Sequence, residues 1–200
     1  MLTLYARRDS SNCAKVFWLL DLLDLPFDLI PMGRGSGAQD TVAFERLTPF
    51  GKVPVITDGA LIAWESNAIL RALAKRAQPN TVWPEDQRQQ TRIDGWMDWA
   101  SLSLTPPLTR LRKVRAAGGE GELAAVIEAA TLLDWQLGQS PFIAGDTLSL
   151  ADITAAPSVH RLGLLSAQEP RLPKLPHLLA YREKLELDPL YRLHIRDALT

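Results

Sequence analysis

The chain has 200 residues, of which 46% are hydrophobic and 22% are charged. This composition is that of a globular protein and excludes a disordered or fibrous chain, and the length allows one domain or two small ones. The 22 basic and 23 acidic side chains leave a net charge of -1. Since phosphate binding needs a basic surplus or patch, the charge gives no general support for a nucleic-acid partner.

Cysteine usage and apolar patterning set further limits. A single cysteine excludes an intramolecular disulfide, a cysteine zinc site and a dithiol redox pair, and it fits a reducing compartment. No apolar stretch reaches the ~18 residues of a membrane span. The first residues, Met1–Tyr5, lack the charged start and apolar run of a signal peptide. We therefore expect a cytoplasmic protein without a membrane partner.

The first third of the chain alternates short strand patterns with helical ones. Asp58-Gly59 stands between two apolar runs and predicts the turn of a β-hairpin. The expected elements are a strand at 2–5, a helix from 13 to 23, a strand at 27–30, a glycine-containing loop at 32–39, a short helix at 42–47, hairpin strands at 53–57 and 60–63, and a helix at 66–77.

After a proline-containing linker the strand patterns end and long helical patterns begin. They cover 85–115 and 120–137, another helix starts near Leu150, and one or two helices close the chain. Pro106-Pro107 lies inside the first pattern and should kink or break it. The patterns predict an α/β domain over 1–78, a linker over 79–85 and an all-α domain over 86–200.

The segment Ser10-Ser11-Asn12-Cys13 follows a strand pattern and opens a helical one. Backbone N–H groups at the start of a helix attract anions and stabilise thiolates, and a hydroxyl there can donate a hydrogen bond to a bound anion. The same residues are also good N-caps, an interpretation that needs no further function. On these residues alone both interpretations stay open.

Two further motifs are ambiguous in the same way. Val53-Pro54 places a proline in an apparent strand, which fits either an ordinary edge strand or a cis peptide bond that leaves the strand edge free for a ligand backbone. Glu65 precedes a helix that Ser66 opens. This corner can hold the ammonium group of an amino acid on Glu65 and its carboxylate on Ser66, or it can be a simple helix cap.

Together the three motifs resemble the N-terminal domain of the cytosolic glutathione transferases. The matching segments are the strand–turn–helix with Ser10, then Gly51-Lys52-Val53-Pro54-Val55-Ile56, then Trp64-Glu65-Ser66-Asn67-Ala68-Ile69. The resemblance covers nearly the whole chain and looks closest to bacterial theta-like and nu-like members, including the enterobacterial enzyme of the bromoacetate-active kind. It implies a thioredoxin-like α/β domain, then an all-α helical-bundle domain, in a homodimer.

The resemblance also implies roles for individual residues. Ser10 would donate a hydrogen bond to the glutathione sulfur and favour its thiolate. Asn12 matches a residue that nu-type members place near the sulfur, and Ser11 is a third candidate for this role. The glutathione-binding residues would be Val53 (with Pro54 in cis) for the cysteinyl backbone, Glu65 and Ser66 for the γ-glutamyl group, and Lys52 or Gln39 for the glycyl carboxylate.

With glutathione as co-substrate, the expected reaction is attack of its thiolate on a small electrophile, as in detoxification. The basic run at 110–115 is either a solvated helix face or part of a site for an anionic co-substrate. The residues expected at the second-substrate pocket are Arg7, Met32, Trp96, Trp99, Leu104 and Arg110. Two alternatives stay open: glutathione-dependent disulfide or peroxide reduction, which Asn12 favours, and a non-catalytic binding or regulatory protein of the same fold.

Cys13 stands where thioredoxin relatives keep a resolving thiol. Without a second cysteine it cannot run dithiol exchange, so the reactive sulfur would arrive on the ligand. We expect Cys13 to be a small apolar residue that faces the core.

The last two patterns are interpreted as structural. In Leu148-Ser149-Leu150-Ala151-Asp152-Ile153, Asp152 would reach back to Ser149 in a capping box, so replacing Asp152 should cost ~0.5–2 kcal/mol. The three histidines match no metal-ligand spacing, and we expect no metal ion.

Overall fold

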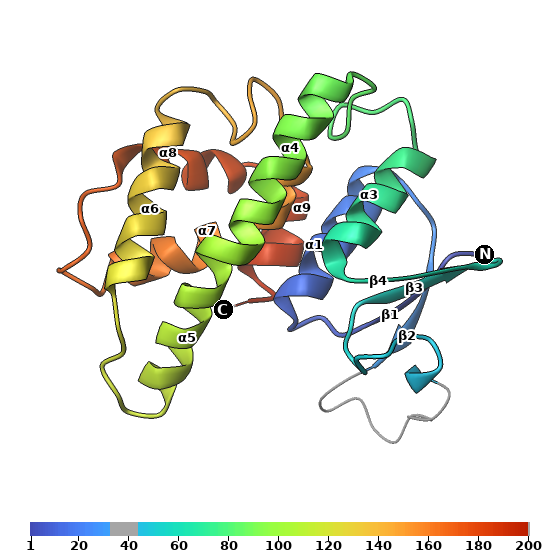
Figure 1. The fold of residues 1–200 in the computed structure, drawn as a ribbon, viewed down its shortest axis with the longest axis horizontal. Helices are drawn as coiled ribbons and strands as arrows, with labels where there is room; N and C mark the ends of the chain where they lie inside the picture. The colour runs from blue at the N-terminus through green and yellow to red at the C-terminus, as the bar shows by residue number, and fades with distance from the viewer. Residues whose placement is uncertain (33–43, 200) are drawn as a thin grey trace. The chain divides into compact units, whose positions relative to one another are not determined.

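A mixed four-stranded sheet carries the first part of the chain. The computed structural model describes residues 1–32 and 44–199. Its sheet order is β2-β1-β3-β4, with β1 parallel to β2 and antiparallel to β3 (Figure 1). The sequence patterns predict all four strands, whose bounds are β1 (Thr3–Ala6), β2 (Asp28–Pro31), β3 (Val55–Asp58) and β4 (Leu61–Trp64).

The predicted turn at Asp58-Gly59 joins β3 to β4. Gly59 has a φ of +58°, in the left-handed region that glycine adopts without steric cost. Pairing begins with Val55 opposite Trp64, so β3 starts later than the pattern predicts. Pro54 explains the late start because it has no N–H to give to the ladder. The predicted loop at 32–39 lies outside the described residues from 33 onwards. Of the predicted short helix at 42–47 the structure describes 44–47, where only Phe44 and Glu45 are helical.

Helix α1 (Ser11–Leu22) is buried along most of its length. All residues from 13 to 20 are buried, whereas a helix with one solvent face would bury a stripe only. α1 packs against α3 (Ser66–Arg76), which is amphipathic and buries Ile69, Leu70 and Leu73. Figure 1 shows the two helices side by side. Both helices are predicted from their apolar spacing.

The end of the chain also packs on α1. Here the short helix α9 (Pro189–Tyr191) leads into the π-helical turn η2 (Arg192–Arg196). The rings of Tyr191 and Trp18 meet edge to face, with centroids 5.6 Å apart, and Nε2 of His194 lies 2.6 Å from Oδ2 of Asp21. These contacts give α1 a second packing partner.

The contact pattern divides the chain into two units. One joins Met1–Asn80 with the segment that begins at Pro189, and the other is Thr81–Asp188. The sequence patterns instead assign the final segment to the helical domain. Helical periodicity shows that a face is apolar but not which neighbour covers it, and the aromatic partners of this segment lie on α1.

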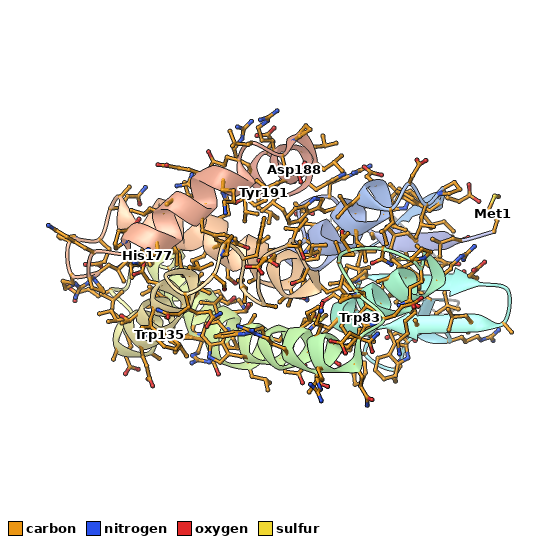
Figure 2. All side chains as sticks on the ribbon, turned by 90° about the horizontal axis from the view of Figure 1, so that it is seen from above. Met1, Trp83, Trp135, His177, Asp188 and Tyr191 are labelled. Carbon is orange, nitrogen blue, oxygen red and sulfur yellow. The ribbon has the colours of Figure 1, made fainter. Side chains whose placement is uncertain are left out.

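The second unit is built around α7 (Leu150–Ser166), which is buried almost continuously from Leu150 to Gly163. α4, α5 and α8 pack against it. In Figure 2 Trp83 marks the buried start of this unit, while Trp135 on α6 is 59% exposed. The other bounds are α4 (Gln87–Trp99), η1 (Ala100–Leu104), α5 (Thr105–Ala116), α6 (Ala124–Leu137) and α8 (Pro176–Leu185).

The predicted fold class, a thioredoxin-like α/β part followed by an all-α part, is therefore confirmed. Among the residues that the structure describes, no helix has both the length and the apolarity needed to cross a bilayer.

The proline pair of the first long helix changes the helix type. Helical residues run from Gln87 to Ala116, and the π-helical turn η1 lies between α4 and α5 and ends two residues before Pro106. The prolines lie in the first turn of α5, and because they have no N–H they cannot continue the hydrogen-bond ladder of the preceding helix. The predicted kink or break is thus a local π-helical turn.

Asp152 joins three segments of the helical unit. As the capping box predicts, its Oδ2 accepts a hydrogen bond from the backbone N–H of Ser149 at 2.8 Å, and it accepts another from the Ser149 hydroxyl at 2.8 Å. Its Oδ1 accepts from the N–H of Ile143 at 2.9 Å and from the hydroxyl of Tyr181 at 2.6 Å. Burial raises the pKa of the Asp152 carboxyl, and these hydrogen bonds oppose that rise.

Replacing Asp152 should therefore cost more than a helix cap alone. We expect Asp152→Ala to lower the free energy of unfolding by about 3 kcal/mol, because four buried donors lose their acceptor. The exposed cap Asp86, which accepts from the N–H groups of Arg88 and Gln89, is the matched control, and Asp86→Ala should cost about 1 kcal/mol. Urea denaturation measures both variants, and equal losses would contradict the role of Asp152 as a junction.

Candidate functional site

The start of α1 is capped by Ser10. Ser10 has extended backbone angles, and its Oγ accepts a hydrogen bond from the N–H of Cys13 at 3.4 Å. The capping interpretation is thus correct, but it does not use the hydroxyl proton, which remains available to a ligand. Ser10 and Ser11 are half-buried, while Asn12 is exposed. Three polar side chains therefore surround the helix end that favours anions.

A small pocket of the first unit brings together six of the residues singled out in the sequence. They are Asn12, Lys52, Val53, Pro54, Glu65 and Ser66. Ser10 and Ser11 stand at the same helix end as Asn12 but are not part of the pocket lining. Gln39 lies outside the described residues, so its placement is untested. The three motifs thus converge, although they are far apart in the sequence.

Three other lining residues were given no role from the sequence: Thr48, Phe50 and Trp64, of which only Trp64 belongs to one of the three motifs. Phe50 and Trp64 are 55% and 38% exposed, and their rings meet edge to face with centroids 5.1 Å apart. The Thr48 hydroxyl accepts from the N–H of Phe50 at 3.3 Å and shapes the turn before Val53. The run Thr48-Pro49-Phe50-Gly51 was a possible signal, because a turn with an aromatic residue directly precedes the Val53-Pro54 motif.

The Val53–Pro54 peptide bond is cis, as the resemblance implies. The ladder of β3 begins after it, at Val55. The backbone of Val53 is therefore not part of the sheet pairing. An extended peptide can use such a backbone as its hydrogen-bonding partner.

Glu65 has a strained backbone at the corner between β4 and α3. Its φ is +66° and its ψ is 119°, angles that glycine tolerates and that other residues rarely adopt. Such strain costs about 1–3 kcal/mol and clusters at functional sites. The Glu65 side chain makes no capping hydrogen bond, so capping does not explain the residue. Ser66, 5% exposed, opens α3 beside it.

A buried lysine lies behind this corner. Lys15 on α1 is only 6% exposed. Burial lowers the pKa of its ammonium group to about 8, and the negative charge of Glu65 opposes the shift. Lys15 was missed in the sequence analysis, although a lysine inside the apolar run of α1 was a visible signal. Its charge balances that of Glu65 close to the pocket.

Cys13 is fully buried in α1. Burial raises the pKa of its thiol, and the hydrogen bond with Ser10 lowers it. A buried thiol with a raised pKa is a poor nucleophile. As this is the only cysteine of the chain, the protein itself supplies no exposed thiol.

The residues expected at the second-substrate pocket belong to two different units. Arg7 pairs with Asp9 at 2.6 Å, and Met32 is buried in a cluster with Phe44 and Val55. In the helical unit, the rings of Trp96 and Trp99 meet edge to face at 5.2 Å, Leu104 is buried in η1, and Arg110 is exposed on α5. Their joint role in binding stays a prediction.

The histidines have structural surroundings. His160 and His194 are buried, and Gly138 packs close to the ring of His177. Within residues 1–32 and 44–199, no group of three or more His, Cys, Asp or Glu side chains is placed to hold a metal ion.

Comparison with known families and proteins gives consistent matches. The family model "Glutathione S-transferase, N-terminal domain" matches residues 4–81, and "Glutathione S-transferase, C-terminal domain" matches residues 116–184. Glutathione S-transferase GstB of Escherichia coli K12 is 32% identical over 186 residues, which cover 86% of this chain and 89% of that protein. Glutathione S-transferase 3 of Zea mays is 30% identical and covers 96% and 91% respectively.

Solved structures give the same result. The theta class glutathione S-transferase of Xanthomonas axonopodis pv. citri, with glutathione bound, superposes with a TM-score of 0.82 at 31% identity. The match covers 100% of this chain and 99% of that one. A delta-class glutathione transferase of Nilaparvata lugens superposes with a TM-score of 0.86 at 22% identity, which shows a shared fold.

The strain at Glu65 has a measurable consequence for stability. We expect Glu65→Gly to be more stable than Glu65→Ala by about 1 kcal/mol, because glycine adopts a positive φ without the steric penalty. Glu128, exposed within α6, is the matched control. There the order should reverse by about 1 kcal/mol, since glycine is a poor helix former. Urea denaturation of the four variants measures this, and the same order at both positions would contradict the strain.

Proposed function

Since this chain belongs to the glutathione S-transferase family, we propose that it transfers the thiolate of glutathione, its co-substrate, to a small electrophile. The observation that carries the proposal is the convergence of the α1 start, the cis Val53–Pro54 segment and the Glu65-Ser66 corner on one pocket. The relative of known structure from Xanthomonas axonopodis pv. citri, whose structure has glutathione bound, supports the same ligand.

Glutathione has three parts for which this pocket offers matching groups. The N–H and C=O of Val53 pair with the cysteinyl backbone. The Glu65 carboxylate accepts hydrogen bonds from the γ-glutamyl ammonium, and the Ser66 N–H and hydroxyl donate to its carboxylate. Lys52 attracts the glycyl carboxylate, a role for which Gln39 is the alternative. The ammonium group of Lys15 and the carboxylate of Glu65 attract each other, so the buried lysine supports the charge at this corner.

The chemistry follows from the helix end. The thiol of bound glutathione loses its proton to solvent, and the partial positive charge of the α1 N-terminus stabilises the thiolate. The Ser10 hydroxyl donates a hydrogen bond to the thiolate sulfur, with Ser11 and Asn12 as the other candidate donors. The sulfur lone pair then forms a bond to the electrophilic carbon of the second substrate, and the leaving group departs with its bonding electrons. Binding both reactants in one site lowers the entropic part of the barrier.

We also propose the wider setting. An electrophilic substrate implies a detoxifying role. The residues expected to line its pocket remain Arg7, Met32, Trp96, Trp99, Leu104 and Arg110.

A homodimer is supported by Leu61 and Ile62, apolar side chains exposed on the edge strand β4. The one reduced cysteine supports a cytoplasmic location, and the balanced charge supports the absence of a nucleic-acid partner.

One observation favours a second candidate, glutathione-dependent disulfide or peroxide reduction. Asn12, the residue that links the chain to nu-type relatives, lines the pocket, whereas Ser10 caps α1. The third reading, a non-catalytic module of this fold, is disfavoured because the strained Glu65 and the polar helix start are both retained.

Two variants separate the candidate donors. We expect Ser10→Ala to lower kcat for conjugation of a model electrophile about 100-fold, because the glutathione thiolate loses one preorganised hydrogen-bond donor. Asn12→Ala should have a smaller effect. The glutathione Kd, measured by calorimetry, should change little in either variant. Thr91→Ala, which removes an exposed hydroxyl from α4, is the control.

Other results would change the assignment. If Ser10→Ala leaves kcat unchanged while Asn12→Ala abolishes turnover, Asn12 is the donor, and a mixed-disulfide substrate should then be turned over faster than the electrophile. If neither variant affects turnover of any substrate, the proposed role of the α1 start is wrong.

A further inference from the structure

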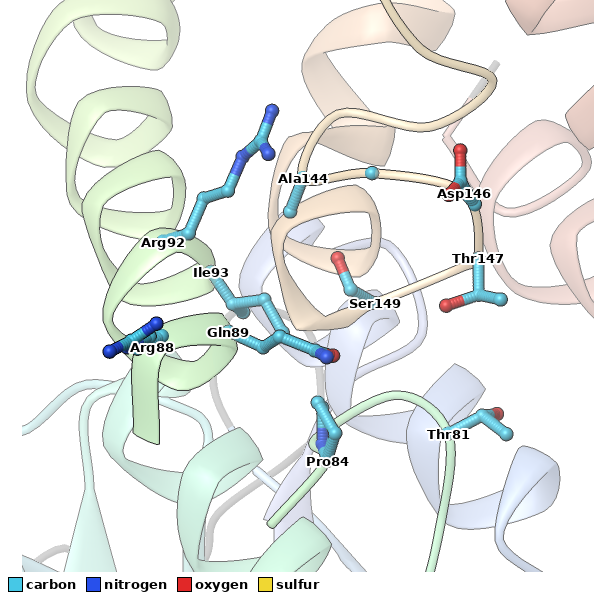
Figure 3. A pocket seen from close by; sticks show the side chains of 11 residues that line it. Thr81, Pro84, Arg88, Gln89, Arg92, Ile93, Ala144, Asp146, Thr147 and Ser149 are labelled. Carbon is cyan, nitrogen blue, oxygen red and sulfur yellow. The ribbon is translucent and has the colours of Figure 1, made fainter. Parts of the chain in front are cut away.

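A larger pocket lies wholly within the helical unit. It has a volume of about 460 Å³, within the ~300–1,000 Å³ usual for small-molecule sites. Its walls are the chain before α4, the first turns of α4, and the turn at 144–149 that leads into α7 (Figure 3). None of its lining residues belongs to the pocket that contains Glu65.

The walls of this pocket are fixed by hydrogen bonds. The N–H of Leu150 donates to the carbonyl of Val82 at 3.0 Å, which ties the start of α7 to the chain before α4. On the α4 side, the side-chain amide of Gln90 donates to the carbonyl of Pro84 at 2.8 Å. The turn is held by backbone bonds between Phe142 and Gly145. The cavity is therefore preformed, which reduces the entropy lost on binding.

One wall carries uncompensated positive charge. Arg88 and Arg92 lie one turn apart on α4, and both are exposed. In the part of the chain that the structure describes, neither guanidinium group takes part in an ion pair. Like charges at this spacing repel each other, so an anion between them would stabilise the helix. Figure 3 shows both arginines on the α4 side.

The facing wall has the opposite charge. Asp146 and Thr147 stand across the pocket from the arginines (Figure 3). The Asp146 carboxylate is exposed, and no ion pair of the described residues includes it. The floor offers neutral partners: the amide of Gln89, and the remaining lone pair of the Ser149 hydroxyl, which donates a hydrogen bond to the Asp152 carboxylate and accepts one from the Asp152 N–H.

We propose that this pocket binds a small zwitterion with two carboxylates and one ammonium group, the chemical class of acidic amino acids and short acidic peptides. The forked guanidinium groups of Arg88 and Arg92 pair with the carboxylates, a geometry that a planar fork favours. Asp146 accepts the ammonium group. Two positive charges and one negative charge in the protein thus meet two negative charges and one positive charge in the ligand.

The test uses the full-length protein and two probes, L-glutamate and glutarate, which differ in the ammonium group. Nuclear magnetic resonance follows the backbone amide signals of Gln89 and Thr147, so that binding here is distinguished from binding at the Glu65 corner. We expect both signals to shift saturably with L-glutamate, and glutarate to bind at least tenfold more weakly. Tenfold corresponds to about 1.4 kcal/mol, the size of one charge-assisted hydrogen bond.

Variants assign the contacts. The double variant Arg88→Gln, Arg92→Gln should lose at least tenfold in affinity for both probes, whereas Lys113→Gln, which removes an exposed α5 charge outside the pocket, should bind as wild type. Asp146→Asn should abolish the preference for L-glutamate over glutarate. No saturable shift, unchanged affinity in the double variant, or equal binding of the two probes to wild type would each overturn the proposal.

Discussion

Helix α1 is buried along residues 13–20 between α3 and the end of the chain, and this burial governs the chemistry at its first turn. A helix packed on all sides has little freedom to shift, so its N-terminal N–H groups point at one fixed place. The same burial encloses Cys13 and raises the pKa of its thiol. The helix therefore offers a site for a thiolate but hides its own sulfur, which is why the account requires the reactive sulfur to come with the ligand.

The Glu65 corner shows how this structure maintains an unfavourable local conformation. A non-glycine residue at a φ of +66° persists only if the surrounding structure holds it there. Here β4 fixes one side, α3 begins on the other, and the buried Lys15 carries a compensating charge. The strained conformation places the Glu65 carboxylate and the first N–H groups of α3 at the same pocket. A helix cap alone does not require this arrangement.

Local patterns predicted the elements and the motifs, but not the contacts between distant segments. The strands, α1, α3, the start of α7 and the link from Asp152 to Ser149 follow from spacing within a few residues. The backbone strain of Glu65 and the return of Tyr191 and His194 to α1 depend on packing far away in the sequence. The hydrogen bonds that Asp152 accepts from Ile143 and Tyr181 also join separate segments of the chain. Local sequence carries no signal for them.

The most direct measurement is the pKa of the sulfur of bound glutathione, followed by the ultraviolet absorbance of the thiolate as pH is varied. If the start of α1 stabilises the anion, the midpoint in wild type should lie at least about one pH unit below the ~8.5 of an ordinary cysteine thiol. Cys13→Ala should show the same midpoint, since the buried thiol takes no part. An unshifted midpoint in saturated wild-type protein, or loss of the signal in Cys13→Ala, would contradict the account.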